Sequence, residues 1–180
     1  MSDDAKERIL KAAIELRLKS RDSGITVEAV ARYAGCAKGL VAYHYKSKRA
    51  VFLEAERAIA GERLRAWTAS LALPDPHGAL DACWEVIRKE AQSGVATYRQ
   101  SELTDWSTND SLTAAIGAGA VGLLRRAGRV PTVAVSELAD LCAVTLPGFA
   151  RALAAGADPG RIEGAYAGFW AALFALTRAA

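Results

Sequence analysis

The sequence contains few of the residues that form disulfides or metal sites. Its 180 residues include three cysteines and two histidines. Cys36, Cys83 and Cys142 are odd in number and form no CxxC pair, and neither His44 nor His77 lies near a cysteine in the sequence. This pattern argues against a disulfide scaffold and against a metal centre. It favours three small, partly buried thiols in a reducing cytoplasm.

Long apolar segments are also missing. The longest uncharged apolar run, residues 165–176, has 12 residues, whereas a membrane helix needs about 18. The first eight residues carry too many charges for a signal peptide. We therefore expect a cytoplasmic protein without a membrane span.

The residues that are abundant favour helices. The chain has 39 alanines and only five prolines, and alanine is the strongest helix former. Asp75-Pro76 and Asp158-Pro159 are helix start signals. No useful segment alternates polar and apolar residues, so we predict an all-α fold of about nine helices. The predicted helices are residues 4–19, 27–33, 37–43, 49–71, 76–92, 95–106, 109–127, 133–155 and 159–178.

The charge is unevenly distributed along the chain. Residues 1–50 carry 11 Lys and Arg against 6 Asp and Glu, whereas residues 51–180 carry 12 against 14. A basic N-terminal segment favours binding to a polyanion, and residues 51–180, which we call the body, then have a different function. We expect a DNA-binding domain at 1–48 and a second domain at 49–180, with residues 49–73 forming a connecting helix.

Two short helices in the basic N-terminal segment have the spacing of a helix-turn-helix motif. Thr26 can cap helix 27–33. Ala34-Gly35-Cys36 forms a tight break before helix 37–43, and Gly35 can adopt the unusual dihedral angles of a turn. In a helix-turn-helix the second helix enters the major groove of DNA.

The residues of this segment resemble the signature of the tetracycline-repressor (TetR) family of regulators. Residues 26–48 read TVEAVARYAGCAKGLVAYHYKSK, and the family pattern runs roughly T-x-x-x-I/V-A-x-x-A-G-V-S-x-G-x-L/V-Y-x-H/Y-F-x-S/N-K. The match covers about residues 9–53. The resemblance implies a transcriptional repressor that binds a palindromic operator as a homodimer and is released by a small-molecule effector. It implies no enzymatic activity and no cofactor.

Six residues are candidates for contacts with DNA. Lys38 begins the second helix, where its ammonium can reach a base edge or a phosphate, and Gly39 leaves room for the backbone to approach the groove wall. Through the resemblance, Tyr43 and His44 lie at the end of the recognition helix, and Lys48 is the lysine that grips phosphate at a helix N-terminus. The candidates are Thr26, Lys38, Gly39, Tyr43, His44 and Lys48.

Four positions depart from the family pattern. Ala37 stands where serine is usual, which removes a cap worth about 0.5–2 kcal/mol. Ala42 replaces a common tyrosine. Arg17 and Arg21 replace an aromatic residue and a glycine, and we expect these arginines to offer compensating phosphate contacts.

The resemblance also gives the body two tasks. The helices at 76–92, 109–127 and 133–155 would surround an effector pocket, since ligand sites have mostly apolar walls. The candidate residues of this pocket are Trp84, Trp106, Cys142 and Phe149. The alternative is that they are ordinary residues of the hydrophobic core. The helices at 133–155 and 159–178 carry apolar residues on more than one face, which indicates a partner. They would form the dimer interface, with operator half-sites about 10 bp apart or a multiple of that.

One competing motif points to a different class of protein. Gly117, Gly119 and Gly122 form a G-x-G-x-x-G sequence, with Glu137 20 residues after Gly117. A dinucleotide site needs such a turn between a strand and a helix, but residues 111–115 make a poor strand. Close packing of a glycine-rich helix is the alternative. A nucleotide-dependent enzyme and a sequence-neutral nucleoid DNA-binding protein remain as alternative functions.

Overall fold

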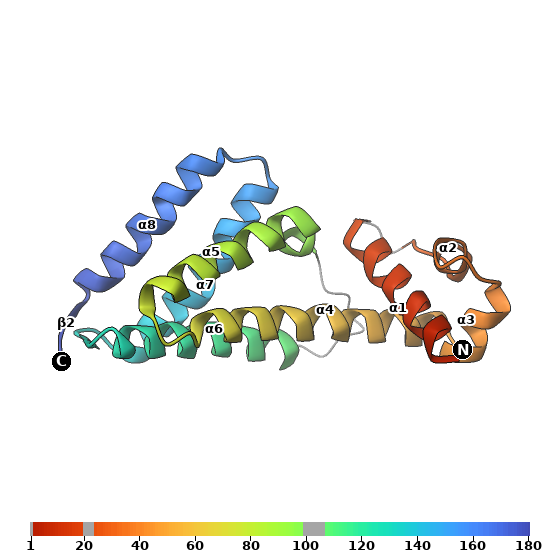
Figure 1. Ribbon diagram of the computed structural model, residues 1–180, viewed down its shortest axis with the longest axis horizontal. Coiled ribbons are helices and arrows are strands. Elements are labelled where there is room, and N and C mark those ends of the chain that lie inside the picture. Colours follow the sequence, from red (N-terminus) through yellow and green to blue (C-terminus); the bar gives the residue numbers. More distant parts are fainter. Residues whose placement is uncertain (1, 20–23, 99–106) are drawn as a thin grey trace. The chain divides into compact units, whose positions relative to one another are not determined.

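The computed structural model describes residues 2–19, 24–98 and 107–180, and helices dominate them (Figure 1). Eight α-helices, one short 3₁₀ helix and two three-residue strands make up these described ranges, which confirms the all-α fold class. Along the chain they are α1 (Ser2–Lys19), α2 (Val27–Tyr33), α3 (Lys38–Tyr45), α4 (Lys48–Leu71), α5 (Pro76–Ser93), η1 (Val95–Thr97), α6 (Ser107–Arg126), β1 (Arg129–Pro131), α7 (Val135–Ala154), α8 (Pro159–Ala175) and β2 (Thr177–Ala179). None of the described helices combines the length and apolar character of a membrane span.

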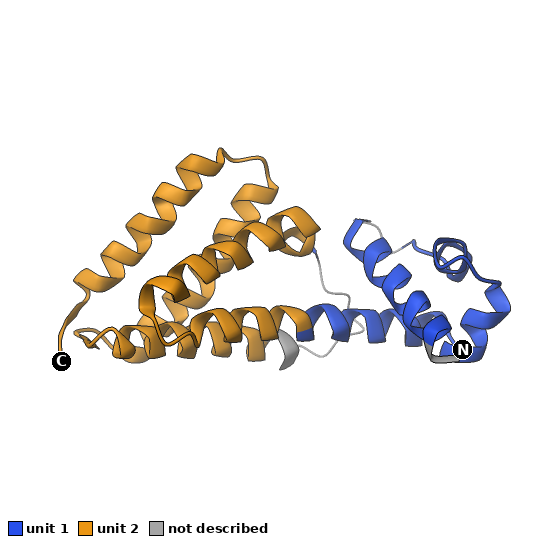
Figure 2. Cartoon of the chain, in the orientation of Figure 1, with its two compact units in different colours: residues 1–61, 98–106 blue, residues 62–97, 107–180 orange. Residues whose placement is uncertain are grey.

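The chain divides into two compact units (Figure 2). Unit 1 contains the described residues up to Gly61 together with Tyr98, and unit 2 contains residues 62–97 and 107–180. The boundary in the sequence falls within α4, so this one helix contributes side chains to both cores.

The core of unit 1 lies among α1, α2, α3 and the beginning of α4. It is built from branched and aromatic side chains that include Ile9, Val30, Val41, Val51 and Phe52, all buried. Apolar side chains recur in these helices at the spacing that places them on one face, and that face points into the core. Burial of these faces holds α1, α2 and α3 against one another and against the beginning of α4.

Local signals set the ends of the helices in unit 1. The amide of Ala29 donates to Thr26 Oγ1 at 3.1 Å, so Thr26 caps α2 as the sequence predicts. Gly35 in the following turn has a φ of +63°, a conformation that costs glycine little. The amide of Ala50 donates to Ser47 Oγ at 3.1 Å, which caps α4.

Unit 2 packs the second half of α4 with α5, α6, α7 and α8. Its core includes Trp67, Ile87, Leu124, Leu146 and Trp170. The two predicted helix starts are confirmed: the Asp75 carboxylate accepts from the amides of His77 and Gly78, and that of Asp158 accepts from the amide of Arg161.

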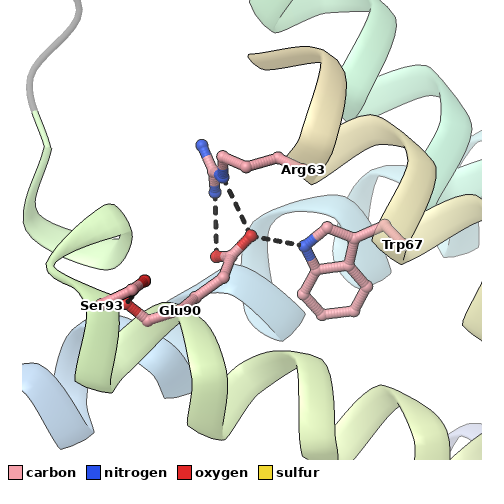
Figure 3. Close-up of polar contacts among 4 residues, drawn as sticks. All are labelled: Arg63, Trp67, Glu90 and Ser93. Atoms are coloured by element: carbon pink, nitrogen blue, oxygen red, sulfur yellow. Dashed lines mark hydrogen bonds and ion pairs between the residues drawn. The ribbon is translucent and has the colours of Figure 1, made fainter. Parts of the chain in front are cut away.

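A buried carboxylate joins α4 to α5 within unit 2 (Figure 3). Glu90 of α5 accepts two hydrogen bonds from the guanidinium of Arg63, at 2.9 and 3.0 Å, and a third from Trp67 Nε1 at 2.9 Å. The Glu90 side chain is 7% exposed and that of Arg63 21% exposed. A buried charge needs such partners, because an unpaired one would be strongly destabilising.

The G-x-G-x-x-G sequence lies in the interior of α6, and its first two glycines serve helix packing. A Cβ added to Gly117 would lie 2.9 Å from the backbone oxygen of Ala139 in α7, and one added to Gly119 would lie 2.9 Å from the Leu71 side chain in α4. This confirms the packing interpretation. A dinucleotide-binding turn would need a strand on its N-terminal side, whereas these glycines are helical.

Two parts of the helix prediction are wrong. Helix α8 ends at Ala175, and Thr177–Ala179 instead pairs antiparallel with Arg129–Pro131. The reason is that the guanidinium of Arg129 donates to the carbonyls of Phe174 and Thr177, which satisfies the end of α8. The predicted helix at 95–106 begins instead as a 3₁₀ turn, Val95–Thr97, and residues 99–106 lie outside the described ranges.

Candidate nucleic-acid interface

Helix α3 has one buried face and one open face. Val41 and Tyr45 are buried against the core of unit 1, and Tyr45 Oη donates to the carbonyl of Lys6 at 3.3 Å. Burial raises the pKa of Tyr45 to about 12. The exposed positions of α3, which are Lys38, Gly39, Ala42 and Tyr43, are therefore held toward solvent by anchors on the opposite side of the same helix.

Lys38 is exposed and forms an ion pair with Glu28 of α2. The side chains of Lys38 and Glu28 are 64% and 59% exposed. The hydrogen bond from Lys38 lowers the pKa of Glu28 below its usual range. The sequence analysis missed this pair, because the two residues lie in different helices, and their contact depends on how α2 and α3 pack against each other.

Gly39 and Tyr43 lie on the open side of α3. A Cβ added to Gly39 would have no heavy atom within 4 Å, so its surroundings are empty in the free protein. Tyr43 is 73% exposed, and its ring meets that of the half-buried His44 edge-on, with centroids 5.1 Å apart. The helix thus presents an aromatic side chain and a bare backbone segment one turn apart.

Lys48 begins α4 beside the Ser47 cap. Its side chain is exposed, with Nζ 5.9 Å from the centroid of the Phe52 ring. The N-terminus of a helix attracts anions, because backbone N–H groups there lack intrahelical acceptors. A cation at this position strengthens that attraction. The Thr26 hydroxyl, by contrast, is already the acceptor of the α2 cap.

The departures from the family pattern have different outcomes. Ala37 precedes α3 without any side-chain cap, as the sequence predicts. The expectation that Arg17 contacts phosphate is wrong, because its side chain is only 11% exposed and its guanidinium forms an ion pair with Glu56 at 2.6 Å and stacks over the Tyr98 ring. Arg21 lies outside the described residues, and Ala42 is exposed on α3.

The predicted effector residues lie in different surroundings in unit 2. Trp84 and Phe149 both pack against Tyr166, with ring centroids 5.2 and 5.8 Å away. Cys142 is fully buried in the core, and burial raises the pKa of its thiol to about 12. Trp106 lies outside the described residues. Of these candidates, Trp84 lines a surface cleft of about 620 Å³.

The described ranges contain no group of three or more His, Cys, Asp or Glu side chains that could hold a metal ion. The candidate site in unit 1 is a surface of cationic and aromatic side chains with an open backbone segment. Such a surface can hold phosphate groups and reach into a groove of nucleic acid.

Comparison with known proteins gives the fold. No family model matches the chain, and no curated protein sequence matches it. A solved structure assigned to the TetR family of transcription regulators, from Shewanella sp. PV-4, is similar with a TM-score of 0.64 and 20% identity, covering 96% of this chain and 97% of that one. A TetR-family regulator from Vibrio parahaemolyticus gives 0.63 and 19%, covering 94% and 98%. NalD of Pseudomonas aeruginosa, the secondary repressor of the MexAB-OprM multidrug efflux pump, gives 0.61 and 18%, covering 86% of each chain. The chain has the fold of TetR-family transcription regulators.

Proposed function

We propose that the protein is a cytoplasmic transcriptional repressor that binds a palindromic operator as a homodimer and is released by a small-molecule effector. The observation that carries the proposal is the open face of α3, where Lys38, Gly39 and Tyr43 project from a folded helix-turn-helix, with Lys48 at the start of the next helix. Helices of this kind read base edges while neighbouring cations hold phosphates.

We assign the two segments of the chain the roles that were predicted from the sequence. Residues 1–48 would bind DNA, and residues 49–180 would bind the effector and form the dimer. Support for a dimer comes from exposed apolar side chains on α7, where Val144 is 66% and Leu141 44% exposed. Apolar residues on an outer helix face favour a partner, and a two-fold dimer matches a palindromic site.

The test begins with selection of bound duplexes from random DNA, followed by titration of the selected duplex at several salt concentrations. We expect Lys48→Ala to weaken binding to all duplexes and to reduce the salt slope by about one unit, because one phosphate contact is lost. Lys89→Ala is the matched control, since Lys89 is an exposed lysine of α5 in unit 2.

Two outcomes would contradict the proposal. Equal affinity for random and palindromic duplexes would favour the sequence-neutral nucleoid protein. An unchanged salt slope in Lys48→Ala would remove Lys48 from the interface. The compared structures are transcription regulators, and the proposal assigns no catalytic step to the chain.

A further inference from the structure

Unit 2 has a surface cleft formed by the end of α5, the end of α7 and the beginning of α8. Its volume of about 620 Å³ lies within the range of small-molecule sites, roughly 300–1,000 Å³. Trp84, Leu153 and Pro159 give it apolar walls, and Glu85, Arg88 and Glu163 bring charge to it. The cleft therefore suits a ligand that is apolar in one part and charged in another.

The charges on the cleft leave one carboxylate unpaired. Arg88 Nη1 lies 2.8 Å from Glu85 Oε1, so these two side chains neutralise each other. Glu163 is exposed and makes no hydrogen bond or ion pair with any residue in the described ranges. The net formal charge of the lining side chains is therefore negative, and Glu163 carries it.

The ends of the helices add to this negative character. Gln92 lies one residue before the end of α5, and Leu153 lies one residue before the end of α7, so two helix C-termini border the cleft. A helix C-terminus carries a partial negative charge. The N-terminus of α8 is the opposing positive end, and the Asp158 carboxylate already caps it by accepting from the amide of Arg161 at 2.8 Å.

Trp84 supplies a fixed aromatic surface. Its indole packs against the Tyr166 ring with centroids 5.2 Å apart, and Tyr166 Oη in turn donates to the Leu80 carbonyl at 2.7 Å. An aromatic face attracts an organic cation as well as apolar groups.

We propose that this cleft binds an organic cation with an aromatic or aliphatic group, whose ammonium faces Glu163 and whose apolar part lies against Trp84. The inference deepens the effector part of the proposed function. The inference depends on the proposed function only for the effect that ligand binding would have on the complex with operator DNA.

Calorimetric titration of the full chain without DNA tests the site. The probes are 4-phenylbenzylammonium and 4-phenylbenzyl alcohol, which share a biphenyl group and differ in charge. We expect the cation to bind at least about threefold more tightly than the alcohol. Glu163→Gln should weaken binding of the cation by about two- to fivefold and leave binding of the alcohol unchanged, because it removes one exposed charge contact. Glu137→Gln removes another exposed carboxylate, at the start of α7 and away from the lining, and should leave both affinities unchanged.

The inference is overturned if the cation gives no binding heat, if both probes bind equally, or if the two variants behave alike. Its failure is separable from failure of the proposed function, because no DNA is present. If the cation binds through Glu163 in a chain that binds no DNA, the cleft assignment is supported and the repressor proposal fails.

Discussion

Two ion pairs join neighbouring helices of this protein in opposite ways. In unit 1, Lys38 of α3 pairs with Glu28 of α2, and both side chains are more than half exposed. In unit 2, Arg63 of α4 pairs with Glu90 of α5 at 21% and 7% exposure, with Trp67 as a third partner. Exposed pairs contribute little to stability and exchange partners readily, whereas a buried carboxylate depends on its partners. The exposed pair on α3 thus leaves its charges available to a partner, whereas the buried pair between α4 and α5 holds two helices together, as does the buried Arg17–Glu56 pair of unit 1.

The glycines show the same contrast. Gly39 in α3 has empty space where a side chain would be, and Gly117 in α6 touches the backbone of Ala139 in α7. In unit 1 the missing side chain leaves a surface open to a partner. In unit 2 it lets two helix backbones come into contact. Four substitutions separate these roles, and the largest effects are expected in unit 2.

Replacing Glu90 should have the largest effect. Glu90→Gln removes the charge that compensates Arg63, and we expect it to lower the free energy of unfolding by about 3 kcal/mol. Urea unfolding followed by circular dichroism measures the change. Glu85→Gln is the control on the same helix, because it breaks the exposed Arg88 pair, which should be worth less than about 1 kcal/mol. Equal losses in both variants would refute the contrast between buried and exposed pairs.

Gly117→Ala comes next in expected effect. The new Cβ would overlap the Ala139 backbone, which cannot move without shifting α7. We expect a loss of about 1–3 kcal/mol, the usual range for overpacking. Gly122→Ala in the same helix meets only the flexible end of Arg126 at 3.4 Å, so better helix propensity should stabilise it by up to about 1 kcal/mol. Melting temperatures of the two variants should therefore move in opposite directions.

The features predicted from sequence are those fixed by residues close together in the chain. The turn at Gly35 and the Thr26 cap depend on residues within a few positions, and the predicted helix 27–33 matches α2 at both ends. Asp75 and Asp158 are local signals of the same kind. The open face of α3 could be read in this way too, because a single short helix positions Lys38, Gly39 and Tyr43.

The features that escaped prediction depend on distant partners. Arg17 is buried in an ion pair with Glu56, a partner that lies 39 positions further along the chain. The strand Thr177–Ala179 forms because Arg129–Pro131 pairs with it across α7 and α8. The glycines of α6 have the spacing of a nucleotide-binding motif in a context that argues against it, and only the contacts with Ala139 and Leu71 show what these glycines pack against. Local spacing carries no information about which of these distant contacts forms.

Gly39→Ala tests the open glycine of unit 1. Because nothing lies within 4 Å of the new Cβ, we expect no steric cost and a gain of up to about 1 kcal/mol in stability from helix propensity. Affinity for the selected operator duplex should nevertheless fall, by at least about threefold, if the α3 backbone approaches the groove wall. Unfolding and DNA titration of the same preparation give both values. Unchanged affinity would show that Gly39 does not face DNA.

The smallest effect is expected for the exposed pair itself. In the free protein Glu28 holds Lys38, so DNA must compete with a carboxylate for that ammonium. Glu28→Gln removes the competitor and should tighten operator binding by about two- to fivefold, corresponding to an exposed ion pair of up to about 1 kcal/mol. The gain should vanish when Lys38 is also replaced by Ala, because the double-mutant cycle isolates the coupling between the two side chains. A gain that persists in the double variant would instead mean that Glu28 acts on DNA through general charge repulsion. Glu62→Gln, which removes an exposed carboxylate paired with Arg65 in unit 2, measures the effect of an equal change in net charge away from α3. If Lys38 is the partner through which Glu28 acts, the exposed pair of unit 1 limits affinity, whereas the buried pair of unit 2 contributes to stability.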